Sequence, residues 1–314
     1  MPDVLTHILF AEKVKDGLSD SNIRHFIRDN ETLYNLGAQG PDILFYYKPW
    51  SPIGSSIREA GERMHHHETA RFFTDAIKIL NKSTGKYYEE LLVYLLGFLC
   101  HYYCDKTIHP YVYSMIETGC YKFEGGRSLL SHYDIEATID TRLWLREKGV
   151  QATKVNNAVM LDVKYFPDVA ANYLSQYLYK TQSKIISDYE IRTAVKNMIK
   201  ILGILYDPRN KKKKIINRLP LPRKCYIENG FADVDVLNEN KRAWNHPGDD
   251  KNQLNLSVEE LLQMAADRCV EVADVICAYL ENGTETDFTK LIPDEDYCTQ
   301  KELGEVKQSP EIPE

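Results

Sequence analysis

Long hydrophobic runs are what this chain most clearly lacks. None reaches the 18 or so apolar residues of a membrane span, so we expect no transmembrane helix. The opening MPDVLTHILF has neither a basic start nor a long apolar segment, so we expect no secretory signal and a cytoplasmic protein. Glycine motifs for dinucleotides or nucleoside phosphates are also missing, which argues against those cofactors.

Excess positive charge and paired cysteines are missing as well. The net charge of −7 argues against a stable complex with nucleic acid, although an acidic protein can act on phosphate esters if metal ions supply positive charge. Seven scattered cysteines, an odd number, do not form a disulfide framework. Cys100 and Cys104 have a spacing that could bind zinc, but no second pair completes a four-sulfur site, so we expect buried packing residues.

Helical periodicity dominates the sequence and predicts an all-α fold without internal repeats. Segment 87–108 is apolar nearly all round, which predicts a central helix buried by the others. His109 precedes Pro110, and pre-proline residues avoid the helical region, so this helix should end there. We expect one multi-helix domain over residues 1–290 and a loose polar tail over 291–314. The other helical patterns lie at 3–18, 20–37, 66–82, 131–149, 166–183, 187–206 and 256–283.

A polar, proline-containing stretch at 207–224 predicts a loop. It contains four consecutive lysines, 211–214. A solvated face is the ordinary interpretation, and peripheral contact with a membrane surface or an anionic substrate is the alternative.

Potential metal ligands are concentrated in the first half of the chain, which holds eight of the nine histidines. His101 and Asp105 are four residues apart, as are His132 and Glu136, so each pair lies on one helix face and can converge on one ion. A single pair of this kind is usually a surface hydrogen bond. The first pair, however, lies within an apolar run, and two pairs together with His109 and the segment MHHHE favour a metal site.

Asp42 follows a turn made by Gly40 and Pro41 and precedes apolar residues. An Asx turn or a helix cap explains this locally. The turn would also hold the carboxylate at a fixed place.

Five segments in this order resemble the zinc-dependent phospholipase C family: MPDVLTHILFAEKV, LGAQGPDILFYY, MHHHETARFF, LGFLCHYYCDKTIHPYV and SHYDIEATID. The resemblance is greatest to the cytoplasmic bacterial branch and extends more distantly to the fungal single-strand nucleases of the same fold. It covers residues 1–145 by motif and, more loosely, the helices to about 285.

The resemblance implies an all-helical fold with two to three zinc ions. One ion would be held by Asp42, a histidine of 65–67 (we favour His65), His101 and Asp105. A second would be held by His109, His132 and Glu136. The third would take His7, a bridging oxygen of Asp105 and the amino terminus, with Pro2 or Asp3 completing the site; otherwise only two ions bind.

The implied activity is hydrolysis of a phospholipid or another phosphodiester by a zinc-bound hydroxide, with Asp42 as the catalytic carboxylate that orients or deprotonates the water. Asp134 and Asp140 are candidates to fix the imidazoles from the outer shell. A nuclease or nucleotidase of the same fold and a non-catalytic metal-binding scaffold are the alternatives. Five aromatic residues could bind a choline-like headgroup, stack on a base, or simply pack in the core: Phe45, Tyr46, Tyr47, Tyr102 and Tyr103.

Overall fold

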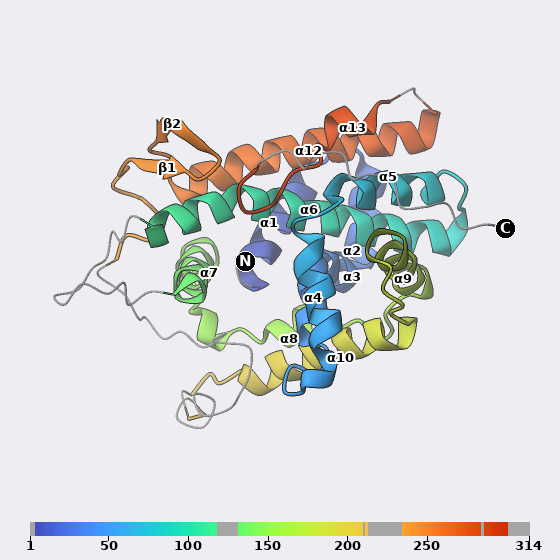
Figure 1. Cartoon of the computed structure of the whole chain (residues 1–314), viewed down its shortest axis with the longest axis horizontal. Coiled ribbons are helices and arrows are strands. Elements are labelled where there is room, and N and C mark those ends of the chain that lie inside the picture. Colours follow the sequence, from blue (N-terminus) through green and yellow to red (C-terminus); the bar gives the residue numbers. More distant parts are fainter. Residues whose placement is uncertain (1–3, 118–130, 210, 213–233, 284–285, 301–314) are drawn as a thin grey trace.

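The computed structural model describes residues 4–117, 131–209, 211–212, 234–283 and 286–300. Helices dominate these residues, and the only sheet among them is an antiparallel pair of short strands, so the predicted all-α fold is confirmed (Figure 1). The helices are α1 Val4–Gly17, α2 Ser21–Asp29, α3 Glu31–Gly37, α4 Ser55–Met64, α5 Thr69–Leu80, α6 Gly85–Glu117, α7 His132–Lys148, α8 Asn157–Leu161, α9 Asp168–Gln182, α10 Asp188–Leu205, α12 Val258–Asn282 and α13 Phe288–Leu291. Short 3₁₀ helices are η1 Gly40–Tyr46, η2 Pro52–Gly54 and η3 Ala152–Lys154, and the strands are β1 Trp244–His246 and β2 Asp249–Leu254.

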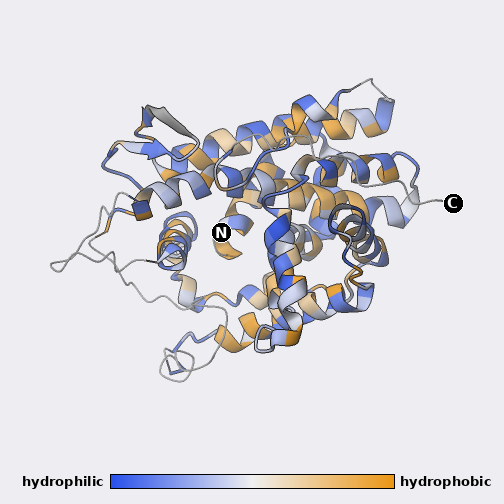
Figure 2. Ribbon diagram, viewed as in Figure 1, coloured by the Kyte–Doolittle hydropathy of each residue, from blue (hydrophilic) through white to orange (hydrophobic). Residues whose placement is uncertain are grey.

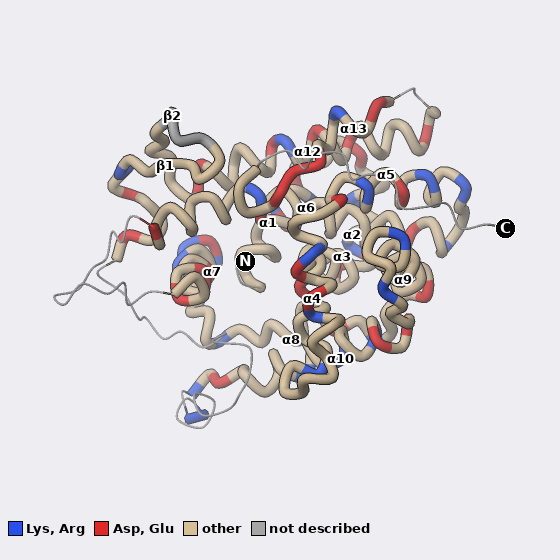
Figure 3. Tube along the Cα trace, viewed as in Figure 1, with Lys and Arg blue, Asp and Glu red and all other residues tan. Residues whose placement is uncertain are grey.

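Helix α6 is the buried centre of the fold. Every residue from 91 to 105 on it is buried, as expected for a helix that is apolar all round. Gly37 on α3 and Gly97 on α6 allow these two helices to approach closely, because a Cβ on Gly97 would lie 2.3 Å from the carbonyl oxygen of Tyr34. The surrounding helices carry both hydrophilic and hydrophobic residues (Figure 2), and charges of both signs are interspersed on α4, α5, α7, α9 and α12 (Figure 3).

The predicted end of the central helix at His109 is wrong, because α6 continues through Pro110 to Glu117. Proline has no N–H, so the carbonyl oxygen of Lys106, four residues earlier, loses its helical donor. The side chain of Gln300 donates to that oxygen instead, at 2.6 Å. His109 therefore stays on the helix face that carries His101 and Asp105.

Helix α7 holds the first turn of α1 in place. Ser131 caps α7 in a capping box with Asp134, and Gly149 ends the helix at φ 65°. Further along α7, Asp140 accepts hydrogen bonds from the backbone N–H groups of Leu5 and Thr6 at 2.8 and 2.7 Å. This contact fixes the start of α1, directly before His7.

The C-terminal part of the chain differs from the expected loose tail. Residues 292–300 pack against the helices, with Ile292 0% and Tyr297 1% exposed. The backbone N–H of Tyr297 donates to the carbonyl oxygen of His65, and the hydroxyl of Thr69 donates to Asp294. The sequence prediction missed this because the segment is mostly polar and its contacts span 185 to 232 positions in the chain. Residues 301–314 lie outside the described part of the chain.

The start of the lysine-containing loop after α10 is held by Asp207. The backbone amides of Lys211 and Lys212 donate to the Asp207 carboxylate, and the predicted loop beyond residue 212 lies outside the described residues. Among the described helices, none combines the length and the hydropathy needed to cross a bilayer.

Candidate metal centre

Five separate parts of the chain bring the eight predicted ligands together. Helix α1 supplies His7, η1 supplies Asp42, and the residue after α4 is His65. Helix α6 supplies His101, Asp105 and His109, and α7 supplies His132 and Glu136. Their ligand atoms form three groups, each within 4.8 Å: His7 with His101 and Asp105, Asp42 with His65 and His101, and His109 with His132 and Glu136.

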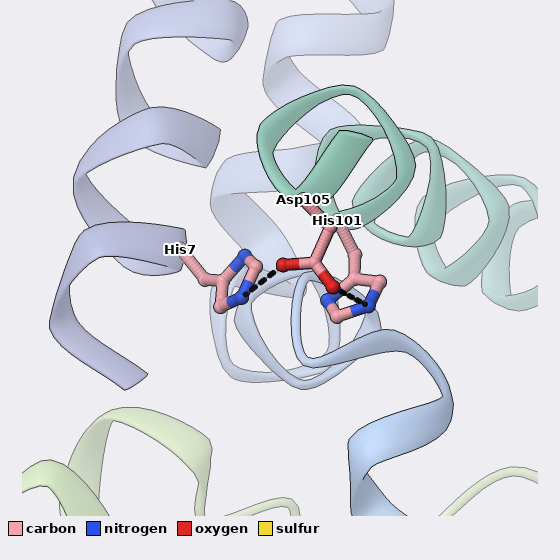
Figure 4. Close-up of side chains that lie close together, drawn as sticks. All are labelled: His7, His101 and Asp105. Atoms are coloured by element: carbon pink, nitrogen blue, oxygen red, sulfur yellow. Dashed lines mark ion pairs between the residues drawn. The ribbon is translucent and has the colours of Figure 1, made fainter. Parts of the chain in front are cut away.

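Asp105 lies at the middle of these groups and is fully buried. Its Oδ1 lies 3.3 Å from Nε2 of His7, and its Oδ2 lies 3.3 Å from Nε2 of His101 (Figure 4). The same Oδ2 lies 3.6 Å from Nε2 of His65 and 3.8 Å from Nε2 of His109. One carboxylate thus faces imidazoles from α1, α6 and the α4–α5 turn, which suits it to bridge two ions.

The other two carboxylates each face their own imidazoles. Nε2 of His65 lies 3.2 Å from Oδ1 of Asp42. Oε1 of Glu136 lies 2.6 Å from Nε2 of His132 and 3.6 Å from Nε2 of His109. The sequence pairs of four-residue spacing are therefore connected through His109, which lies between Asp105 and Glu136.

Apart from the 2.6 Å between His132 and Glu136, which is of hydrogen-bond length, these separations of 3.2 to 3.8 Å fit shared metal ions better than hydrogen bonds. Two ligand atoms about 2.0 Å from one tetrahedral zinc lie about 3.3 Å apart, whereas an N–H···O hydrogen bond is shorter. Within the described residues, buried atoms at the centre have no hydrogen-bond partner: both ring nitrogens of His7 and His101, both oxygens of Asp105, Nε2 of His65 and His109, and Oδ1 of Asp42. Buried polar atoms without partners are costly, and bound zinc would satisfy the carboxylate oxygens and one nitrogen of each imidazole.

The protonation states also suit metal binding. Burial lowers the pKa of His65 and of His101, and that of His109 well below its usual value, so these imidazoles keep a free lone pair at neutral pH. Burial alone would raise the pKa of Asp105, but His101 and His109 together lower it well below its ordinary value, so this carboxylate is ionised. Neutral imidazoles around a carboxylate are the donor set that divalent zinc requires.

Local structure selects His65 from the three consecutive histidines. His65 is 3% exposed, and its Nδ1 lies 2.9 Å from the carbonyl oxygen of Gly61, which assigns the proton to Nδ1 and turns Nε2 towards Asp42. His66 instead pairs with Asp296, and His67 is exposed. The structure thus places the favoured histidine at the centre and its two neighbours outside it.

Gly40 makes room for His101. It has φ 52°, a left-handed conformation that suits glycine, and a Cβ there would lie 2.2 Å from Cδ2 of the His101 ring. The turn that leads to Asp42 is therefore pressed directly against a candidate ligand.

Three of the five aromatic residues considered for substrate binding lie in the core. Tyr47, Tyr102 and Tyr103 are buried, and the hydroxyl of Tyr102 donates to the carbonyl oxygen of Pro293. Phe45 is partly exposed and stacks on His65, with ring centroids 6.0 Å apart. Phe45 therefore has a direct ring contact with a residue of the metal centre.

Sequence reasoning missed the contribution of the C-terminal segment. The ring of Tyr297 lies edge-on to His65, with centroids 5.2 Å apart, and 6.0 Å from that of His101. Sγ of Cys298 lies 3.7 Å from Nδ1 of His109. The only available signal was an aromatic residue and a cysteine in an otherwise polar stretch. Asp140 accepts hydrogen bonds from the backbone N–H groups of Leu5 and Thr6, and Asp134 accepts one from the hydroxyl of Ser131. Their proposed role of fixing the imidazoles stays a prediction.

Comparison with known families agrees with this arrangement. A family model described as zinc-dependent phospholipase C matches residues 6–197, which is more than half of the chain and includes all eight candidate ligands. The chain belongs to this zinc-dependent phospholipase C family. No curated protein and no solved structure gave a match. The family match ends before α12 and the C-terminal segment, so the contacts of Tyr297 and Cys298 with the centre are features of this chain outside the matched region.

Zinc binding to the metal-free protein should weaken as the pH falls below about 7. Burial raises the pKa of Asp42 to about 7, so this carboxyl must lose a proton when an ion binds. One displaced proton reduces the affinity about tenfold for each pH unit below that pKa and has no effect above it. Competition with a chelator of known affinity across this range measures the slope, and a flat profile below pH 7 would contradict the assignment of Asp42 as a ligand.

Proposed function

We propose that this protein is a zinc-dependent hydrolase of phosphate esters, acting as a phospholipase C-like phosphodiesterase with two to three zinc ions. The observation that supports this most directly is the position of Asp105, whose two oxygens face different imidazoles at distances suited to shared ions. The family match and the three groups of ligands agree with a zinc hydrolase.

Zinc bound here would supply Lewis acidity for the phosphate oxygens and lower the pKa of a bound water towards 7. The chain's own residues would hold the ions, and they exclude most solvent, because His101 and Asp105 are fully buried. The three carboxylates of Asp42, Asp105 and Glu136 would offset only part of the charge of two or three zinc ions, so a loaded centre would keep a net positive charge that attracts a phosphodiester to an otherwise acidic protein.

Asp42 is our candidate for the carboxylate that orients the attacking water and accepts its proton. Its side chain is 11% exposed, against 0% for Asp105 and 2% for Glu136, so it is the carboxylate that water or substrate can reach most easily. Asp42→Asn should therefore reduce kcat, and the loss should exceed any loss of bound zinc.

Purified protein reconstituted with zinc should hydrolyse phosphatidylcholine, and single-stranded DNA is the comparison substrate. His101→Ala and Glu136→Ala should each abolish turnover while circular dichroism shows an unchanged helical fold. Turnover of DNA but not of phospholipid would favour a nuclease of the same fold. One zinc or less per chain, with no turnover of either substrate, would favour a scaffold and contradict the proposal.

The cytoplasmic location and the peripheral membrane contact expected from the sequence remain predictions. A sedimentation assay with phosphatidylcholine vesicles, with and without zinc, would measure the membrane contact.

A further inference from the structure

A fourth group of metal-binding side chains lies outside the eight candidate ligands. His66, Asp296 and Cys298 each offer one ligand atom, and these atoms lie within 4.8 Å of one another. Two separate parts of the chain supply them: His66 lies between α4 and α5, and the other two lie in the C-terminal segment. All three are partly exposed, so an ion could enter from solvent.

Asp296 is held so that one of its oxygens faces this group. Its Oδ1 accepts hydrogen bonds from the backbone N–H groups of Cys298 and Thr299 at 2.8 Å each, and from the hydroxyl of Thr299 at 3.0 Å. Its Oδ2 lies 2.6 Å from Nδ1 of His66. At 2.6 Å these two atoms form a hydrogen bond, which an ion would have to replace, while the bonds to Oδ1 would keep the carboxylate oriented as a ligand.

The His66 ring is oriented from its other side as well. Its Nε2 lies 3.4 Å from Oε1 of Glu62, one turn earlier on α4. If Nδ1 binds an ion, the Nε2–H group can donate to Glu62, which is the usual role of a carboxylate behind a histidine ligand.

Cys298 gives this group a chemistry that the other three groups lack, since those contain only nitrogen and oxygen donors. A set of one imidazole, one carboxylate and one thiolate suits a borderline-soft divalent ion such as zinc, and does not suit calcium or magnesium. Its Sγ also lies 3.7 Å from Nδ1 of His109 and 3.6 Å from the hydroxyl of Tyr113, so a competing role is to orient His109.

We propose that His66, Asp296 and Cys298 bind a further zinc ion, with a coordination position left for water, that fastens the C-terminal segment to the α4–α5 turn. This site lies next to the main metal centre. His66 directly follows His65, and the Tyr297 N–H group, next to both Asp296 and Cys298, donates to the His65 carbonyl oxygen at 3.0 Å. An ion here would hold the segment that contacts His65 and His101. The proposal does not depend on phosphodiester hydrolysis.

The test is cobalt substitution of the full-length protein, because cobalt bound by a thiolate gives a sulfur-to-metal charge-transfer band in the near ultraviolet. Wild-type protein loaded with cobalt should show this band, and elemental analysis should give one more zinc per chain for wild type than for Cys298→Ala. His66→Gln should also lose both the band and one ion. Asp296→Asn should weaken both.

Matched controls are available within the chain. His67→Gln changes the adjacent, exposed histidine, and Cys277→Ala changes a cysteine on α12; both should keep the band and the full number of ions. A wild-type protein without the band would overturn the proposal. A band that survives His66→Gln but not Cys298→Ala would also overturn it, because the thiol would then bind an ion together with the His109 group. Hydrolytic activity is not among the readouts, so failure of this proposal and failure of the proposed function are distinguishable.

Discussion

Asp105→Asn should remove zinc from the centre and abolish activity, while leaving the metal-free protein folded. The substitution keeps the shape of the side chain but removes the charge that four imidazoles face at 3.3 to 3.8 Å. Zinc affinity should fall by more than about a hundredfold, the upper end of the loss expected even for an outer-shell partner. Zinc content, turnover and the rise in Tm on adding zinc measure these effects.

The melting temperature separates loss of the metal from loss of the fold. The pKa of Asp105 lies well below its ordinary value without an ion, so its ionised form favours the fold, and metal-free Asp105→Asn should be folded but less stable than the metal-free wild type. The wild type should gain stability on adding zinc, and the variant should gain little. If the variant keeps the full number of ions, Asp105 does not bridge them.

Asp29→Asn is the matched control. His25 and Asp29 have the same four-residue spacing as His101 and Asp105, and their facing atoms lie 3.4 Å apart. Their side chains, however, are 68% and 62% exposed, against 0% for the central pair. Asp29→Asn should therefore leave zinc content and turnover unchanged.

The same comparison shows what the sequence could predict. Spacing alone does not distinguish the surface pair from the central pair. The apolar run around His101 does distinguish them, because it predicts burial, and a buried pair of this kind needs a further partner. Periodicity predicted the helical fold and spacing predicted the two four-residue pairs, whereas the full set of eight ligands was implied by the resemblance to the zinc-dependent phospholipase C family.

What could not be predicted depends on contacts between distant parts of the chain. Pro110 is ordinarily a signal for the end of a helix, yet here the Lys106 carbonyl oxygen accepts from Gln300, which lies 190 or so residues away. Tyr297 lies in a polar segment whose composition predicts a loose tail, and only its contacts with His65 and His101 show that it belongs to the core. Local propensity does not include such long-range contacts.

Gly40→Ala should disrupt the metal centre from a position that binds no metal. The left-handed backbone costs alanine about 1–2 kcal/mol, and a methyl group 2.2 Å from Cδ2 of His101 must displace a fully buried ring. Overpacking of this kind adds about 1–3 kcal/mol, so the free energy of unfolding should fall by about 2–5 kcal/mol. Since His101 belongs to two of the ligand groups, zinc affinity should fall as well. Chemical denaturation and zinc titration measure the two losses.

Gly203→Ala on α10 is the control for the same chemical change. A Cβ there would meet only the Cβ of Ala158 at 3.7 Å, an ordinary contact, so the variant should be as stable as the wild type or up to about 1 kcal/mol more stable, since alanine favours a helix.

A double-mutant cycle with His101→Ala tests the cause of the Gly40 effect. If the clash with the ring is responsible, removing the ring should relieve it. The loss in free energy of unfolding caused by Gly40→Ala should then be smaller in the His101→Ala background than in the wild type, by at least about 1 kcal/mol. The remaining cost is the left-handed backbone, which is independent of the ring. Equal costs in both backgrounds would mean that the glycine matters only for the turn, and that the position of His101 is not set by its contact with η1.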